Sequence, residues 1–291
     1  MGALTRGMRM RRIAGRVPLR TSVLGSILVL LLGNSFTAAS AASGGDGPSW
    51  SARGVATFTG RAFDTCTAPP LATMRAWRAS PYGAVGVYVG GWARGCRQPE
   101  LNASWLRGVR DLGWSVLPLY VGSQAPCVQA AHKKKYRLGE DPAGTGTKEG
   151  RDAVRAARAL GIVPRSPLYL DVEAYDERQA ECARAVLAFV RAWDRAVTVE
   201  GYVPGFYSSA DSGVAHLERE RRAGTADLPG VMWFAHWTGR ASLDAPEVLE
   251  PQAWQPQRRI HQYAGNVTER YGGQVLSVDR NQVDAPVARL G

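Results

Sequence analysis

Short apolar runs alternate with amphipathic stretches along most of the chain, which predicts strands alternating with helices. The clearest helix is the one in which Ala183, Val186, Leu187 and Val190 recur at spacings of three and four residues. Weaker apolar stripes predict further helices near 69–78, 100–112, 148–160 and 211–221. The first five strands are expected at 62–66, 84–91, 115–122, 168–173 and 203–209.

The pattern changes after residue 221. Three more strands are expected at 231–237, 259–264 and 275–283, with a Pro-containing irregular connector at 239–258 and no strong helices between them. Alternating strands and helices imply a parallel sheet, and eight strands in this length favour a barrel over an open sheet. No G-x-G-x-x-G follows the first strand, so a dinucleotide-binding fold is not supported. We therefore predict an α/β fold, a TIM-like barrel modified to (β/α)5(β)3.

The N-terminal 41 residues have the pattern of a secretory signal peptide. Six arginines and no acids precede an apolar run at Val23–Leu32, and Ala39-Ser40-Ala41 is a small-residue cleavage site. The alternative is an uncleaved anchor, and Arg11-Arg12 leaves both the Sec and the twin-arginine routes open. We expect a protein that is secreted, extracellular or associated with the cell envelope.

The mature part is expected to be one domain. Residues 42–57 are interpreted as a Gly/Ser-rich linker and residues 58–291 as the barrel domain. Loss of residues 1–41 removes six positive charges, so the formal net charge falls from +11 to +5. No nucleic-acid motif is present, and the run His132-Lys133-Lys134-Lys135 is interpreted as a solvated part of a long loop, Ser123–Gly146. We expect a monomer with no nucleic-acid partner and no stable membrane span after cleavage.

Four cysteines lie in the predicted exported part, at Cys66, Cys96, Cys127 and Cys182. An even number in an oxidising compartment predicts two disulfides. We favour Cys66–Cys96 and Cys127–Cys182, because each would tie neighbouring loops, although the sequence allows three pairings. The spacings match no zinc pattern, and no metal or organic cofactor is expected.

Two acids end the predicted fourth strand, where an apolar run leads to Asp171-Val172-Glu173. Residues two apart on a strand point to the same face, so these carboxyls are expected side by side. Such a pair can supply the general acid and the charge stabiliser of sugar hydrolysis. The alternative is a strand end with a helix-capping Asp and a surface Glu.

A barrel gathers its site at the carboxyl ends of its strands. Acids, amides and aromatics recur at those ends, a combination typical of carbohydrate sites. Asp64, Asp171 and Glu173 are the candidate catalytic residues, and the candidate substrate-binding residues are Tyr88, Tyr120, Gln124, Tyr207, Trp233, His236, Gln262 and Asp279. Three alternatives stay open: Asp64 as a helix cap, Trp233 and especially Trp237 as core residues, and Gln262 and Asp279 as groups that close the barrel.

These features resemble two related families. The Asp171-Val172-Glu173 motif, Asp64, Tyr207, Gln262-Tyr263 and Asp279-Arg280-Asn281 resemble family 25 glycoside hydrolases, the lysozyme-like muramidases. A closer similarity is to the secreted glycoside-hydrolase-like family called domain of unknown function 1906, through Phe63–Pro69, Tyr88–Gly91, Tyr120–Gln124 and Gly150–Ala153. The resemblance covers roughly residues 60–284.

The resemblance implies roles for the acids. Glu173 would be the general acid, and Asp171 and Asp64 would stabilise positive charge or orient an N-acetyl group. Muramidases often carry another acid after the sixth strand, where this chain has Trp233-Phe234-Ala235-His236. The function expected first is hydrolysis of peptidoglycan or another cell-envelope glycan. The second is a non-catalytic glycan-binding or envelope-organising role. A metal-dependent phosphodiesterase or deacetylase ranks third, since no ligand motif such as H-x-x-E-H occurs.

Overall fold

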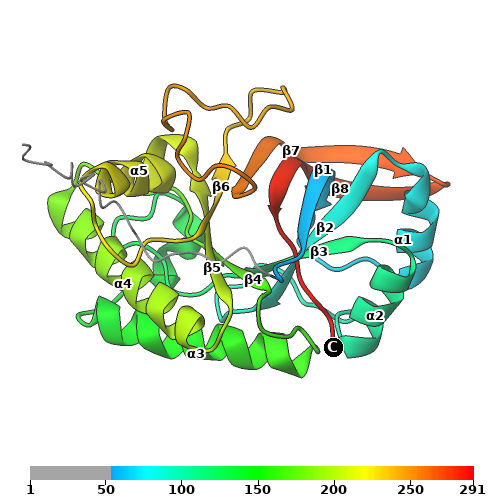
Figure 1. Ribbon diagram of the computed structural model, residues 1–291, viewed down its shortest axis with the longest axis horizontal. Helices are drawn as coiled ribbons and strands as arrows, with labels where there is room; N and C mark the ends of the chain where they lie inside the picture. Colours follow the sequence, from blue (N-terminus) through cyan, green and yellow to red (C-terminus); the bar gives the residue numbers. More distant parts are fainter. Residues whose placement is uncertain (1–53) are drawn as a thin grey trace, which may run out of the picture. The chain divides into compact units, whose positions relative to one another are not determined.

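The computed structural model describes residues 54–291 as a closed eight-stranded barrel surrounded by helices (Figure 1). The predicted signal peptide, and the predicted linker up to residue 53, lie outside this range. The strands follow one another around the barrel in chain order: β1 (Thr57–Asp64), β2 (Tyr82–Gly90), β3 (Ser115–Tyr120), β4 (Pro167–Asp171), β5 (Val203–Ser209), β6 (Val231–Ala235), β7 (Arg259–Tyr271) and β8 (Gln274–Pro286).

The direction of the strands confirms the modified barrel. Neighbours from β1 to β7 are parallel, whereas β8 is antiparallel to both β7 and β1. The reversal follows from the connection, because the short turn at Gly272-Gly273 joins β7 to β8 and leaves no room for a crossover helix. The outer part of this hairpin packs beside the first helix, where Trp77 Nε1 donates to the Gln274 carbonyl oxygen (3.1 Å).

A helix follows each of the first five strands, as the apolar periodicity predicts. They are α1 (Leu71–Ala76), α2 (Ala103–Asp111), α3 (Pro142–Ala159), α4 (Ala180–Val199) and α5 (Ala215–Arg222), joined by the short helical segments η1 (Trp77–Ala79), η2 (Ala131–Tyr136) and η3 (Ala210–Val214). Helices α3 and α4 run side by side along the barrel (Figure 1).

Helix α3 begins earlier than the sequence analysis predicted. The Asp141 side chain accepts a hydrogen bond from Gly144 N (2.8 Å), and Pro142 occupies the first turn. Both are ordinary helix-start signals, but the Gly-rich first turns hide the apolar stripe. The predicted loop is therefore shorter than Ser123–Gly146, and η2 gives part of it regular structure.

The barrel interior is a packed core. Tyr169 and Trp233 are fully buried inside it, together with Leu117, Leu119 and Ile260. Gly86 of β2 gives this core room, because a Cβ there would lie 2.6 Å from Asp64 Cβ. A larger apolar layer fills the space between the strands and the helices.

Both favoured disulfides are present. Cys66–Cys96 has a Cα–Cα distance of 5.7 Å and Cys127–Cys182 one of 6.0 Å. The first joins the loops that follow β1 and β2, and the second joins the loop that follows β3 to the start of α4. Both therefore fix loops at the carboxyl ends of the strands.

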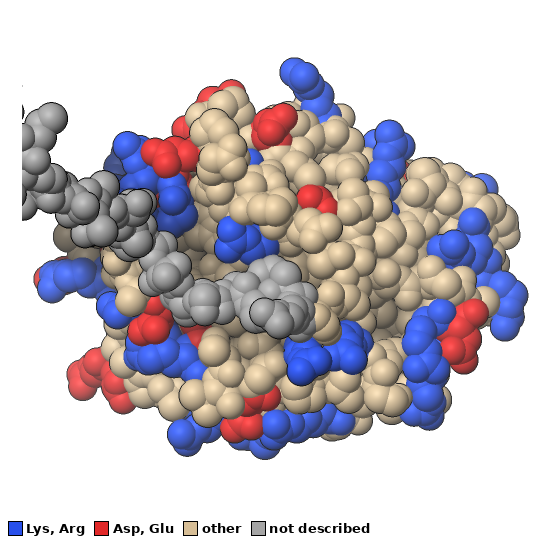
Figure 2. Space-filling view, in the orientation of Figure 1, with Lys and Arg blue, Asp and Glu red and all other residues tan. Residues whose placement is uncertain are grey.

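None of the helices within residues 54–291 is long and apolar enough to cross a membrane. On the face drawn in Figure 2, the Lys and Arg side chains lie mostly around the edge, with acids among them.

Candidate functional site

One half of the barrel mouth is a hydrogen-bonded network built on Asp64, the last residue of β1. Asp64 Oδ2 accepts hydrogen bonds from Asn281 Nδ2 (2.7 Å) and from Gln262 Nε2 (3.1 Å). The other side of the Asn281 amide, Oδ1, accepts from Trp233 Nε1 (2.8 Å). Asp64 is therefore held from strands β7 and β8 and does not cap the helix near Pro69; the α1 cap position is Pro70, with no side-chain cap.

Gln262 is the hub of this half. Its Oε1 accepts from the Tyr207 hydroxyl (3.0 Å) and from Trp237 Nε1 (3.0 Å), while its Nε2 also reaches Asp279 Oδ2 (3.4 Å). Asp279 Oδ1 in turn accepts from the Asn266 backbone N–H (2.6 Å). The network fixes two carboxyls, two amides, two indoles and a phenol in one geometry.

Burial controls protonation in this half. Desolvation raises the pKa of Asp64 to about 7; the nearby charge of Asp279 adds to the rise, and the bonds from Asn281 and Gln262 oppose it. Desolvation also raises the pKa of Asp279, against the bond from Asn266 N–H. A pKa near 7 means that both the protonated and the ionised form of Asp64 are populated near neutral pH.

The other half of the mouth is built on Asp171 and Glu173, which lie at different depths. Asp171 ends β4 with 2% of its surface exposed, and its Oδ1 has no hydrogen-bond partner within residues 54–291. Glu173 follows the strand, and its side chain is 33% exposed. Desolvation, and next the charge of Glu173, raise the pKa of Asp171 well above its usual range, while Lys133 opposes the rise.

Gln124 braces this half from below. It is fully buried; its Nε2 donates to the Asp171 carbonyl oxygen (3.0 Å), and its Oε1 accepts from Glu173 N (2.9 Å). Both ends of its amide are thus occupied by the backbone around the acid pair. Gln124 therefore holds the backbone of the Asp171–Glu173 segment in place. It is not exposed to a ligand, so the prediction that it binds substrate is wrong.

Lys133 is a residue that the sequence analysis missed. Its Nζ lies 3.5 Å from Glu173 Oε1 and donates to the Ala93 carbonyl oxygen (3.3 Å), and the residue is 6% exposed. The prediction that the whole basic run is solvated is therefore wrong for Lys133, although Lys134 and Lys135 are exposed. Segment η2, which follows the disulfide-bonded Cys127, turns this one lysine inward.

A cavity of about 760 Å³ opens beside the ends of β5 and β6. Glu173, Tyr207, His236 and Gln262 line it, as the sequence predicted for a common site. Asp64 and Asp171 do not line it, which corrects the expectation that all three candidate catalytic acids would share one open pocket. Both lie buried, so Glu173 is the one candidate catalytic acid that borders this cavity.

Trp237 also lines the cavity, and the interpretation of Trp237 as a core residue is wrong. It is 57% exposed, because β6 ends at Ala235 and Trp237 falls on the loop beyond it. Its ring lies over Gly265, where a Cβ would lie 2.0 Å from Trp237 Cζ2. The hydrogen bond to Gln262 and the contact with Gly265 hold the exposed indole at the rim of the cavity.

Two predicted aromatic contacts are not available at the mouth. The Tyr120 hydroxyl donates to Asp152 Oδ2 (2.9 Å), and its ring lies 6.4 Å from that of Trp193, so Tyr120 faces α3 and α4 outside the barrel. The reason is strand alternation, because Leu119 takes the inward position. Trp233 lies inside the barrel and is fully buried.

Tyr88 lies at the interface of the two halves. It packs against the barrel core, and burial, with the charges of Asp171 and Asp64, raises the pKa of its hydroxyl well above the usual range. It therefore remains a neutral hydrogen-bonding group. Across residues 54–291 no three His, Cys, Asp or Glu side chains are arranged to hold a metal ion.

Comparison with known proteins gives a family and a fold. Residues 75–283 match the model of the Rv2525c-like, glycoside hydrolase-like domain. No curated protein matches the chain. An uncharacterized B. stearothermophilus protein aligns with 77% of this chain and 95% of its own at 22% identity and a TM-score of 0.51. The modular autolysin LytC from Streptococcus pneumoniae aligns with 79% of this chain and 47% of its own at 15% identity and a TM-score of 0.51.

Proposed function

We propose that this chain, which belongs to the Rv2525c-like, glycoside hydrolase-like family, is a secreted protein that acts on peptidoglycan or another cell-envelope glycan. One observation carries the proposal: Glu173 borders a cavity that also has an exposed indole, next to the buried carboxyl of Asp171, whose pKa is raised by burial. An indole face and hydrogen-bonding side chains are what a sugar ring needs. The shared fold with an autolysin agrees with this but concerns the fold alone.

In this proposal Glu173 is the general acid. Asp211 and Glu247 also line the cavity, but Glu173 is the candidate catalytic carboxyl that does, and a general acid must lie within hydrogen-bond distance of the glycosidic oxygen. Asp171 and Asp64 are buried beside it: in the ionised form they would stabilise developing positive charge, and in the protonated form, which burial favours, they would orient an N-acetyl group.

A second candidate function is glycan binding without turnover. The observation that favours it is the Lys133–Glu173 contact, in which the ammonium group lies 3.5 Å from the carboxyl as in a structural ion pair. A charged Glu173 would instead accept hydrogen bonds from sugar hydroxyls. The same cavity and the same Trp237 would serve either function.

Digestion of purified cell walls by wild type and Glu173→Gln separates the two candidates. Gln keeps size and a hydrogen-bond acceptor for Lys133 but has no proton to transfer, so a hydrolase should lose about 10²–10⁴-fold in kcat. Glu100→Gln, at an exposed position before α2, makes the same charge change and should behave as wild type. Saturable glycan binding without release of fragments by wild type would establish the binding function, and absence of both would refute the proposal.

A further inference from the structure

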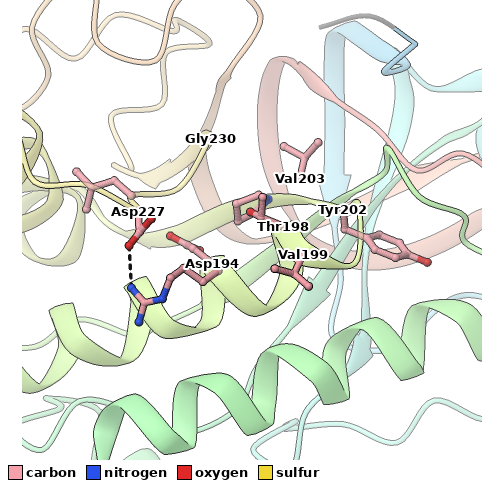
Figure 3. A pocket seen from close by; sticks show the side chains of 10 residues that line it. Asp194, Thr198, Val199, Tyr202, Val203, Asp227 and Gly230 are labelled. Atoms are coloured by element: carbon pink, nitrogen blue, oxygen red, sulfur yellow. Dashed lines mark hydrogen bonds and ion pairs between the residues drawn. The ribbon is translucent and has the colours of Figure 1, made fainter. Parts of the chain in front are cut away.

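A second pocket, of about 280 Å³, lies at the end of the barrel opposite the mouth (Figure 3). Its walls are the second half of α4, the start of β5 and the segment just before β6. Strands β5 and β6 begin here, whereas the cavity at the mouth lies where they end. The two sites are therefore separate, and nothing proposed for the first assigns a role to the second.

The walls of this pocket are mostly apolar. Val199, Val203, Pro204 and Leu228 contribute hydrocarbon, and Val199 is one of the few large apolar side chains exposed within residues 54–291. Tyr202 adds ring surface, since its hydroxyl already donates to the Ile162 carbonyl oxygen (2.7 Å). An engineered apolar cavity of about 150 Å³ binds benzene, so this space is large enough for a ligand somewhat larger than one ring.

One acid in the pocket lacks a partner. Asp194 is 2% exposed, and neither of its carboxyl oxygens has a hydrogen bond from any residue between 54 and 291. The other acid, Asp227, which Figure 3 labels beside Asp194, is instead satisfied, because it pairs with Arg195 (2.8 Å) and Arg191 (3.7 Å). A buried polar group without a partner is costly, so the pocket combines an unsatisfied acceptor with an apolar wall.

We propose that this pocket binds a small organic amine, with its ammonium group on Asp194 and its hydrocarbon part against Val199, Val203 and Leu228. Arg195, which also lines the pocket, is already paired with Asp227, so the group left for a ligand is Asp194, and a pure hydrocarbon would leave it without a partner. An amine with an apolar body satisfies both features of the pocket.

The electrostatics of Asp194 agree with this assignment. Burial, with the charge of Asp227, raises the pKa of Asp194 well above its usual range, and Arg195 opposes the rise. Burial therefore disfavours the ionised form of Asp194. A bound ammonium ion favours the carboxylate, so binding should release a proton.

Calorimetric titration of the purified protein with 2-phenylethylamine tests the proposal, with 3-phenylpropionate as an anionic comparator of similar size. Wild type should bind the amine at least about tenfold more tightly than the anion. Asp194→Asn should weaken amine binding about 10–100-fold, the usual range for hydrogen bonds to charged groups. Glu181→Gln, the same kind of change at an exposed position on the same helix, should have no effect.

A second variant guards against a folding defect. Leu228→Trp keeps Asp194 but fills the pocket, so it should abolish amine binding while thermal unfolding stays cooperative. Failure of the folded wild type to bind the amine saturably would refute the proposal. Equal amine affinity in wild type and Asp194→Asn would refute it as well.

Discussion

The two halves of the barrel mouth hold their acids by different means. Around Asp64, neutral amides from β7 and β8 donate hydrogen bonds, and every side-chain donor of the network ends on a named acceptor. Around Glu173, the stabilising group is a charge, the Lys133 ammonium, and the neighbouring Asp171 keeps an oxygen without a partner. In the first half Asp64 is buried away from the cavity, which its partner Gln262 borders; in the second half the acid itself, Glu173, borders the cavity.

The acids at the strand ends of one barrel can therefore differ in role: some support the site, and others are placed to contact a ligand. Hydrogen bonds from amides fix geometry without changing the net charge of a site. An ion pair with one partly exposed member can rearrange when a ligand arrives, because water already solvates part of it. The amide half is therefore suited to support, and the ion-paired half to contact with a substrate.

The largest expected effect is on the pH dependence of stability, through Asp64→Asn. The pKa of Asp64 lies near 7 in the folded protein and near its ordinary value of 3.8 when unfolded, so the folded state binds more protons between these values. The stability that this proton contributes is complete below about pH 4 and is lost as the pH rises through about 7. Asn carries no titrating proton, so the variant should exceed wild type at pH 8 by a few kcal/mol, up to about 4.

Urea unfolding at pH 4.5 and pH 8 measures this effect. Wild type should lose more stability between the two values than the variant does. Equal losses would show that the amide network holds Asp64 ionised, and the contrast between the halves would fail.

Lys133→Met tests the ion-paired half. Met keeps much of the buried stem but removes the charge, which leaves Glu173 without its partner. Breaking a fully buried pair costs roughly 3–5 kcal/mol, and the partial exposure of Glu173 reduces this to about 1–3 kcal/mol. Hydrogen exchange should also rise in residues 123–140, since the lysine anchors η2 to the Ala93 carbonyl.

The neighbouring Lys134→Met is the matched control, because Lys134 is exposed. It should change the free energy of unfolding by no more than about 0.5 kcal/mol. If both variants unfold alike, the Lys133–Glu173 contact does not stabilise this half.

The smallest effect is expected for Trp237→Ala, at the cavity rim where the two halves meet. In the proposed function the exposed indole contacts the sugar, so glycan affinity should fall about fivefold to tenfold, or roughly 1 kcal/mol. Stability should change little, because only one hydrogen bond, to Gln262, is lost. Affinity for soluble cell-wall fragments measures the loss; unchanged affinity would place the glycan elsewhere.

Much of the fold follows from local sequence. Period-two and period-3.6 apolar patterns reflect the geometry of strands and helices, so eight strands and the positions of five helices were predictable. The Asp171-Val172-Glu173 motif and Asp64 were also found from the sequence, since acids directly after apolar runs fall at the strand ends of a barrel. The pairing Cys66–Cys96 and Cys127–Cys182 was favoured because each disulfide would tie neighbouring loops, and it is confirmed.

The burial and partners of individual side chains were decided by tertiary structure alone. Asn281, which the sequence analysis quoted within a strand motif but did not place in the site, bonds to Asp64 across 217 residues, and Gln262 does so across 198. Lys133 is buried and Lys134 is exposed, although the two are identical neighbours in a basic run. Sequence periodicity reports which face of an element is apolar. Hydrogen bonds and ion pairs between distant segments depend on how the barrel closes, and only the closed barrel brings those groups within reach.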